Sequence, residues 1–127
     1  QLEADHPVDL VVADLSFISL ATVLPALTAC ADPAADIVPM VKPQFEVGRD
    51  RVGPGGVVSD PALRVDAVLS VARRAAELGW SAVAAVASPL PGPAGNVEYF
   101  LRLRSDAEQH DDAVQAAVRR AVDEGPQ

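Results

Sequence analysis

Residues 8–14, VDLVVAD, form a short apolar run that ends in an acid. Its length and its β-branched side chains predict a buried strand of a parallel sheet. Residues 37–42, IVPMVK, have the same form and end in Lys42. Pro39 within this second run is unusual for a central strand, because proline has no N–H to donate to the ladder. Two such runs with a helical pattern between them predict an α/β fold.

Helical patterns lie between and after these runs. Residues 20–30 place their apolar side chains on one helical face, and Pro25 either interrupts that helix or sits in its first turn. A second helix is predicted to start at Asp60 and Pro61, which suit the N-cap and the first helical position, and to end at Gly79. Residues 111–123 predict a closing helix.

Two further strands follow the second helix. Residues 80–87 predict a third strand, in which Trp80 packs in the core or at the sheet edge. Residues 97–103 alternate between apolar and other side chains and predict a fourth. A Pro- and Gly-rich turn of about hairpin length, residues 88–96, connects them. The first three strands are therefore expected to be parallel, and the fourth antiparallel.

Composition limits the possible classes of function. A length of 127 residues suits one domain, and no apolar run approaches the ~20 residues that span a membrane. Cys30 is the only cysteine, which excludes an internal disulfide and favours a reducing, cytoplasmic environment, and His6 and His110 have no companions that suggest a metal. The net charge of −8 argues against a nucleic-acid surface over the whole domain, so RNA binding would need a local patch or a partner domain.

Three charged residues are predicted to meet at one edge of the sheet. Asp14 and Lys42 each stand at the end of a predicted parallel strand, and Glu98 stands near the start of the antiparallel one. An antiparallel strand begins where its parallel neighbours end, and ligands of open α/β sheets bind outside that carboxyl edge. The edge with Asp14, Lys42 and Glu98 is therefore the candidate site.

Lys42 is the only lysine among ten basic residues, the others being arginines. The pKa of lysine moves with burial and neighbouring charge, whereas arginine keeps its proton. Lys42 therefore suits proton transfer, but the two carboxylates beside it favour its charged form, so a bound cation must counter them before Lys42 can accept a proton. The alternative is ordinary surface charge, because strands end at solvent and Asp14 could simply cap the following helix.

Three segments together resemble one family. They are VVADLSFISL (residues 11–20), IVPMVKPQFEVGRDRVGPGGVVSDP (residues 37–61) and SPLPGPAGNVEYFLRLR (residues 88–104). In the same order and with compatible spacing, they are similar to segments of the haemolysin A-type (TlyA) ribosomal RNA 2′-O-methyltransferases, which are related to the FtsJ-type enzymes. The resemblance covers residues 8–104.

The resemblance implies an activity and its residues. Members of that family use a Lys-Asp-Lys-Glu tetrad to direct methyl transfer from S-adenosylmethionine to a ribose 2′-hydroxyl. The resemblance places the Asp on Asp14, the second Lys on Lys42 and the Glu on Glu98. It also implies that Asp14 and the residues after it line the methionine side of the cofactor site, namely Leu15, Ser16 and Phe17.

Residues 43–59 predict a long loop beside this site, and loops of that length are usually functional or disordered. Arg49 and Arg51 lie on it in an otherwise acidic chain. With ribosomal RNA, or a ribosomal subunit, as the implied partner, they are candidates for phosphate contacts, the alternative being solvated loop charges.

Other parts of the family's pattern have no match in these 127 residues. In family members the first catalytic lysine, a Gly-rich S-adenosylmethionine loop and an N-terminal S4-like RNA-binding domain lie upstream. Residues 1–127 are therefore expected to be the C-terminal half of a Rossmann-like methyltransferase domain, inactive alone. An apolar edge beside residues 8–14 would then be exposed and favour self-association. The alternative is a truncated, non-catalytic module that binds RNA or a protein partner.

Overall fold

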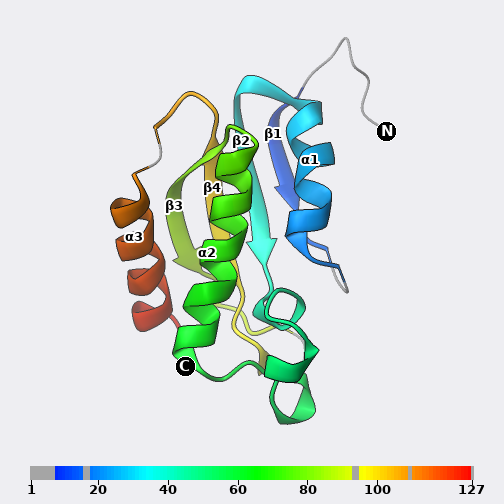
Figure 1. Ribbon diagram of the computed structural model, residues 1–127, viewed down its shortest axis with the longest axis vertical. Coiled ribbons are helices and arrows are strands. Elements are labelled where there is room, and N and C mark those ends of the chain that lie inside the picture. Colours follow the sequence, from blue (N-terminus) through cyan, green and yellow to red (C-terminus); the bar gives the residue numbers. More distant parts are fainter. Residues whose placement is uncertain (1–7, 16–17, 93–94, 109, 127) are drawn as a thin grey trace.

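The computed structural model describes residues 8–15, 18–92, 95–108 and 110–126 (Figure 1). Four strands and three α-helices form its framework: β1 (Val8–Ala13), α1 (Leu20–Cys30), β2 (Ala31–Val41), α2 (Pro61–Glu77), β3 (Ser81–Ala87), β4 (Tyr99–Arg104) and α3 (Asp111–Glu124). The loop between β2 and α2 contains three single turns of 3₁₀ helix: η1 (Pro43–Phe45), η2 (Arg49–Arg51) and η3 (Pro54–Gly56). The predicted α/β fold class is confirmed.

The four strands form one sheet in the order β1-β2-β4-β3. The pair β1 and β2 is parallel, while β4 is antiparallel to both of its neighbours. The first three strands therefore run in one direction and the fourth against them, as the connection lengths predict. The turn before β4 returns the chain into the sheet between β2 and β3, so that the last strand of the sequence occupies an inner position.

Strand β2 is longer than the apolar run that predicts it, and it tolerates Pro39. Its ladder to β4 joins Ile37 to Leu103, Met40 to Phe100 and Val41 to Tyr99, and Pro39 is not among these pairs. On the other side Pro39 lies opposite Ala13 of β1. A proline can occupy this inner strand because position 39 is not one of the paired positions in the ladder to β4.

Local signals explain the helix boundaries. The side chains of Ser19 and Asp60 cap α1 and α2 by accepting hydrogen bonds from Ala21 N (3.2 Å) and Ala62 N (2.9 Å). Pro61 occupies the first turn of α2, as predicted, and Gly79 follows that helix with a φ of 87°. Pro25 lies inside α1, which nevertheless continues to Cys30.

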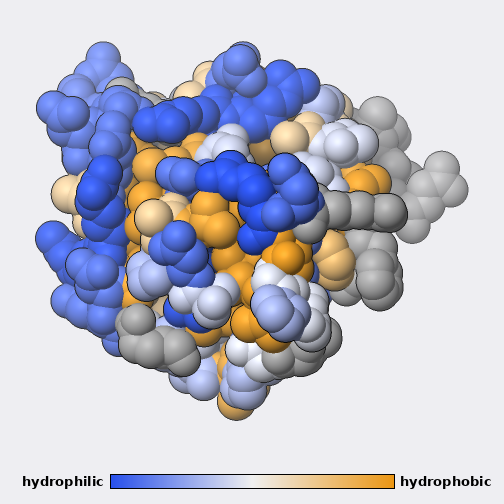
Figure 2. All heavy atoms as spheres, turned by 60° about the horizontal axis from the view of Figure 1, so that its bottom comes forward, coloured by the Kyte–Doolittle hydropathy of each residue, from blue (hydrophilic) through white to orange (hydrophobic). Residues whose placement is uncertain are grey.

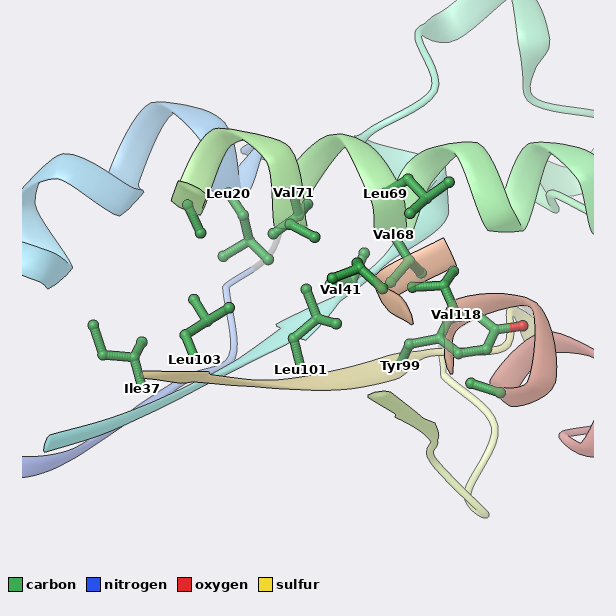
Figure 3. Packing of buried hydrophobic residues seen from close by; sticks show 14 of the residues in the cluster. Leu20, Ile37, Val41, Val68, Leu69, Val71, Tyr99, Leu101, Leu103 and Val118 are labelled. Carbon is green, nitrogen blue, oxygen red and sulfur yellow. The ribbon is translucent and has the colours of Figure 1, made fainter. Parts of the chain in front are cut away.

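The helices pack against one face of the sheet. In Figure 1, α1 and α2 lie side by side across that face, and α3 packs against β3 and α2. Figure 3 shows side chains of the helices, including Leu20, Val68 and Val118, pointing toward Val41, Leu101 and other residues of β2 and β4. Burial of each such side chain stabilises the fold by about 1.5–3 kcal/mol, before entropy is counted. Trp80 is buried in this core, as predicted.

The opposite face carries exposed apolar side chains. Leu10 and Val12 of β1 are 57% and 64% exposed, whereas Val11 and Ala13, which alternate with them, turn toward the helices. Val86 of β3 is exposed in the same way. Within the described residues β1 pairs only with β2, so its outer edge and its outer face both reach the surface. No helix in the described part of the chain is long and apolar enough to cross a membrane.

Candidate functional site

The three charges predicted to converge do lie at one end of the sheet. Asp14 is the first residue after β1, and Lys42 is the first after β2. Glu98 directly precedes β4, which starts where β2 ends because the two strands are antiparallel. Figure 1 shows the loop with η1, η2 and η3 at this same end. Figure 2, with this end turned forward, shows hydrophobic residues bordered by hydrophilic ones.

Asp14 and Lys42 form a direct ion pair. Asp14 Oδ1 lies 2.5 Å from Lys42 Nζ, and the two side chains are 60% and 8% exposed, respectively. A buried ammonium group needs a compensating charge, because it has lost most of its hydration. Asp14 supplies that charge from the solvent side of the pair, and its open flank leaves the pair accessible to a ligand.

Glu98 is buried beside this pair. Its side chain is 6% exposed, and burial raises the pKa of its carboxyl group. The positive charge of Lys42 acts against that shift and lowers the pKa, while the negative charge of Asp14 raises it further. Glu98 Oε2 has no hydrogen-bond partner among the residues that the structure describes. A buried carboxylate oxygen in this state is costly for stability and is typical of a functional site.

The turn before β4 wraps closely around Glu98. Ser88 N donates a hydrogen bond to the Glu98 carbonyl oxygen (2.7 Å). Gly92 lies against the Glu98 side chain, so that a Cβ at this position would collide with the carboxylate. A side chain at position 92 would therefore force the Glu98 carboxylate to shift from its present position.

Asn96 joins this turn to the long loop. Its side chain is fully buried; Oδ1 accepts a hydrogen bond from Val58 N (2.9 Å) and Nδ2 donates one to the Gly56 carbonyl oxygen (2.8 Å). From the sequence, a role in shaping the turn before Glu98 is favoured for Asn96 over a functional one. Its bonds instead cross to residues about forty positions away, and they hold the two loops of the site together.

Glu46 forms a second connection, between the segment after Lys42 and the start of α1. Its Oε1 accepts a hydrogen bond from the Ser19 hydroxyl (2.7 Å), and its Oε2 accepts one from Leu20 N (2.9 Å). Burial raises the pKa of Glu46, and these two hydrogen bonds act in the opposite direction. Sequence reasoning misses Glu46, because its partners lie 26 and 27 positions away. The only visible signal is Ser19, which suits the N-cap position of a helix.

The structure describes only some of the other predicted site residues. Leu15 is partly exposed after Asp14, whereas Ser16 and Phe17 lie outside the described residues. The side chain of Arg49 is also outside them. Arg51 is about half exposed and lies 3.5 Å from Asp66 of α2, so it has a protein partner in this structure.

A groove lies between the start of α1 and the long loop. Its volume is about 570 Å³, and it is lined by Ile18, Ser19, Gln44, Phe45, Gly48, Val52, Gly53 and Gly56. Its lining residues come from the two segments that follow Asp14 and Lys42, and none of the three charged residues lines it. Among residues 8–15, 18–92, 95–108 and 110–126, no group of three or more His, Cys, Asp or Glu side chains is placed to hold a metal ion.

Comparisons with known proteins agree on one family. The family model described as FtsJ-like methyltransferase matches residues 1–105. The chain is 68% identical over 121 residues to the 16S/23S rRNA (cytidine-2′-O)-methyltransferase TlyA of Mycobacterium tuberculosis, covering 94% of this chain and 45% of that protein. It is 33% identical over 99 residues to the 23S rRNA (cytidine-2′-O)-methyltransferase TlyA of Campylobacter jejuni, covering 77% of this chain and 38% of that protein.

A solved structure has the same fold. The crystal structure of a protein described as a hemolysin from Lactococcus lactis superposes with a TM-score of 0.80 at 31% sequence identity. That match covers 94% of this chain and 60% of the other. The chain thus spans less than half the length of the curated relatives it matches.

Proposed function

The chain belongs to the FtsJ-like methyltransferase family, and from this premise we propose that it carries most of the catalytic residues of a ribosomal RNA 2′-O-methyltransferase. Residues 1–127 are then the C-terminal half of a Rossmann-like domain that depends on S-adenosylmethionine. The substrate of the whole domain is 16S or 23S ribosomal RNA. The observation that supports this most directly is the Asp14–Lys42 ion pair beside the buried Glu98, at the carboxyl edge of the sheet.

The side chains suit transfer of a methyl group to a hydroxyl. Lys42 holds the ribose 2′-hydroxyl and takes its proton as the new bond forms. For this Lys42 must first release the proton that its ion pair with Asp14 favours, and the positive charge of a bound sulfonium would promote that release. Arginine could not do so, because it keeps its proton. Asp14 fixes the position of Lys42 through the 2.5 Å contact, and Glu98 completes the charge network from the buried side. Alignment of the reacting oxygen is the main task of such a site.

The same residues suit the cofactor that the family implies. S-adenosylmethionine supplies a methyl group activated by a positively charged sulfonium. The exposed carboxylate of Asp14 and the carboxyl of Glu98, whose Oε2 has no hydrogen-bond partner within the described part of the chain, make the site favourable for a cation. We propose that Asp14, Leu15, Ser16 and Phe17 line the methionine side of the cofactor.

Arg49 and Arg51 are proposed contacts to the phosphates of the RNA. Arg51 can leave Asp66 for a phosphate at little cost. Their 3.5 Å contact is between two well-exposed side chains and contributes little to stability. A phosphate could replace that carboxylate through a bidentate interaction. In an otherwise acidic chain, a local basic contact of this kind is one way to bind RNA, a partner domain being the other.

The first test is binding of S-adenosylmethionine by calorimetry. It compares this chain with a longer polypeptide in which the chain follows the residues that precede the matched region in the relatives. The chain alone is expected not to bind, and the longer polypeptide is expected to bind and to methylate ribosomal RNA. Absence of binding and transfer in the longer polypeptide would refute the proposal and favour a non-catalytic module that binds RNA or a protein.

The second test is Lys42→Arg in the longer polypeptide. This variant keeps the positive charge and the ion pair but removes the ability to accept a proton. Methyl transfer is expected to fall by at least about 100-fold, as is typical for loss of a general base, while RNA binding stays unchanged. Full activity of Lys42→Arg would overturn the role of Lys42.

A further inference from the structure

The chain leaves the two parallel strands at Asp14 and Lys42, and the segments that follow are joined a second time by Glu46. Ser19 and Leu20 start α1, five and six positions after Asp14, and Glu46 stands four positions after Lys42. Phe45 N donates to the Lys42 carbonyl oxygen (2.9 Å), so that η1 transmits the position of Glu46 to the backbone of Lys42. Two connections, the ion pair and the Glu46 contacts, therefore link the same two segments.

The local chemistry explains why Glu46 binds there. The first N–H groups of a helix have no partner within the helix, and the positive end of the helix dipole attracts an anion. The first turn of α1 has no acidic residue of its own. Ser19 satisfies Ala21 N, and Glu46 satisfies Leu20 N from 26 positions away while also accepting from the Ser19 hydroxyl. Glu46 thus satisfies a free N–H group at the start of α1, as the acid of a capping box does, but it comes from another loop and bonds to Leu20 N rather than to the N–H of the N-cap residue.

A partly buried carboxylate caps a helix at a higher desolvation cost than an exposed one would. Burial raises the pKa of Glu46, which means that the fold works against its ionised form. An Asp or Glu within the first turn of α1 would provide the same charge at the surface with little desolvation. The feature that Glu46 adds is the connection between α1 and the Lys42 segment.

We infer that Glu46 is a positioning residue for the proposed methyl transfer: it holds the Lys42 segment against the start of α1 and so fixes Lys42 against Asp14. This inference rests on the proposed function. The ion pair fixes the Lys42 side chain relative to Asp14, but by itself it does not fix the Lys42 segment relative to the start of α1. The second connection removes that freedom and fixes where the ammonium group lies relative to the bound substrate. A displacement of about 1 Å at such a group can lower the rate by roughly 100-fold.

The test uses the fact that Lys42 is the only lysine. Labelling with ¹⁵N- and ¹³C-lysine gives one side-chain signal, which reports the environment of Lys42 without cofactor or RNA. Asp14→Asn provides the reference signal of a lysine without its ion pair. Glu46→Leu removes both hydrogen bonds at similar volume. Glu46→Gln is the matched control, because its amide can accept from Leu20 N and donate to the Ser19 oxygen.

In Glu46→Leu the lysine signal is expected to move toward that of Asp14→Asn, and the Leu20 amide is expected to lose its protection from hydrogen exchange. In the longer polypeptide, kcat of Glu46→Leu should fall by roughly 10- to 100-fold. Both Leu20 protection and kcat should return to within about threefold of wild type in Glu46→Gln, which keeps the hydrogen bonds.

Three results would overturn the inference. One is an unchanged lysine signal in Glu46→Leu. Another is a kcat loss that only matches the unfolded fraction measured by thermal unfolding, since that indicates a purely structural role. The third is a Glu46→Gln variant as impaired as Glu46→Leu. A wild-type polypeptide that transfers no methyl group refutes the proposed function instead, and the Lys42 and Leu20 signals then still decide whether Glu46 positions Lys42.

Discussion

Asn96→Ala removes the connection between the two loops of the site, and its cost can be worked out from the structure. The substitution deletes two hydrogen bonds, from Val58 N to Asn96 Oδ1 and from Asn96 Nδ2 to the Gly56 carbonyl. Val58 is fully buried, so water cannot replace the lost acceptor, and an unsatisfied buried N–H costs about 1–3 kcal/mol. Gly56 is exposed and can bind water, so its carbonyl adds only about 0.5–1 kcal/mol.

Asn96→Ala is therefore expected to lower the free energy of unfolding by roughly 1.5–4 kcal/mol. That is a large share of the stability of a small domain. The assay is urea denaturation of the chain, followed by circular dichroism. Gln115→Ala is the matched control: its amide donates to Asp111 (2.7 Å) on the exposed side of α3, so the loss should stay within about 0.5 kcal/mol.

A loss below about 1 kcal/mol for Asn96→Ala would refute this reasoning, because a buried donor without an acceptor cannot cost so little. It would mean that the two loops separate and rehydrate in solution. Equal losses in Asn96→Ala and Gln115→Ala would refute it as well, because the two amides differ mainly in burial.

Three further predictions concern Glu98 and the open side of the sheet. Because the pKa of Glu98 is raised above its ordinary 4.5 in the folded chain, the folded state binds this proton more tightly. The stability that the bound proton of Glu98 contributes is complete below pH 4.5 and is lost as the pH rises through the raised pKa. In urea denaturation at several pH values, the free energy of unfolding of Glu98→Gln should therefore fall less with rising pH than that of the wild type. Equal falls in the two proteins would contradict this. Gly92→Ala should destabilise the fold by about 1–3 kcal/mol and displace the Glu98 carboxylate, and an unaltered melting temperature would exclude the predicted clash. The chain should self-associate through β1, and Leu10→Thr with Val12→Thr should weaken that association in sedimentation velocity; a wild-type chain that stays monomeric at all concentrations would refute it.

Much of the fold is visible in the sequence because local signals agree with the tertiary structure. The apolar run before Asp14 predicts β1, and the Asp60-Pro61 pair predicts the start of α2. The strand-end argument places Asp14, Lys42 and Glu98 together before any coordinates are considered, since it needs only strand directions. Their ion pair and mutual electrostatic effects agree with that placement. Their catalytic role stays a prediction.

What the sequence hides are the contacts between distant segments. Strand β2 begins at Ala31, well before its apolar run, because pairing with β1 extends through residues of low strand propensity. Glu46 and Asn96 look like ordinary loop residues, since a polar side chain carries no mark of a partner 26 to 40 positions away. The inner position of β4 is hidden for the same reason, because alternation predicts a strand but not its neighbours.

The inner position of β4 also sets an order of events during folding. Its ladder to β2 joins Ile37 to Leu103, across more than half of the chain. Contacts of such long sequence separation form slowly, because a large loop must close before they are gained. The charged site is therefore completed only when β4 inserts between β2 and β3, because that step brings Glu98 beside Asp14 and Lys42.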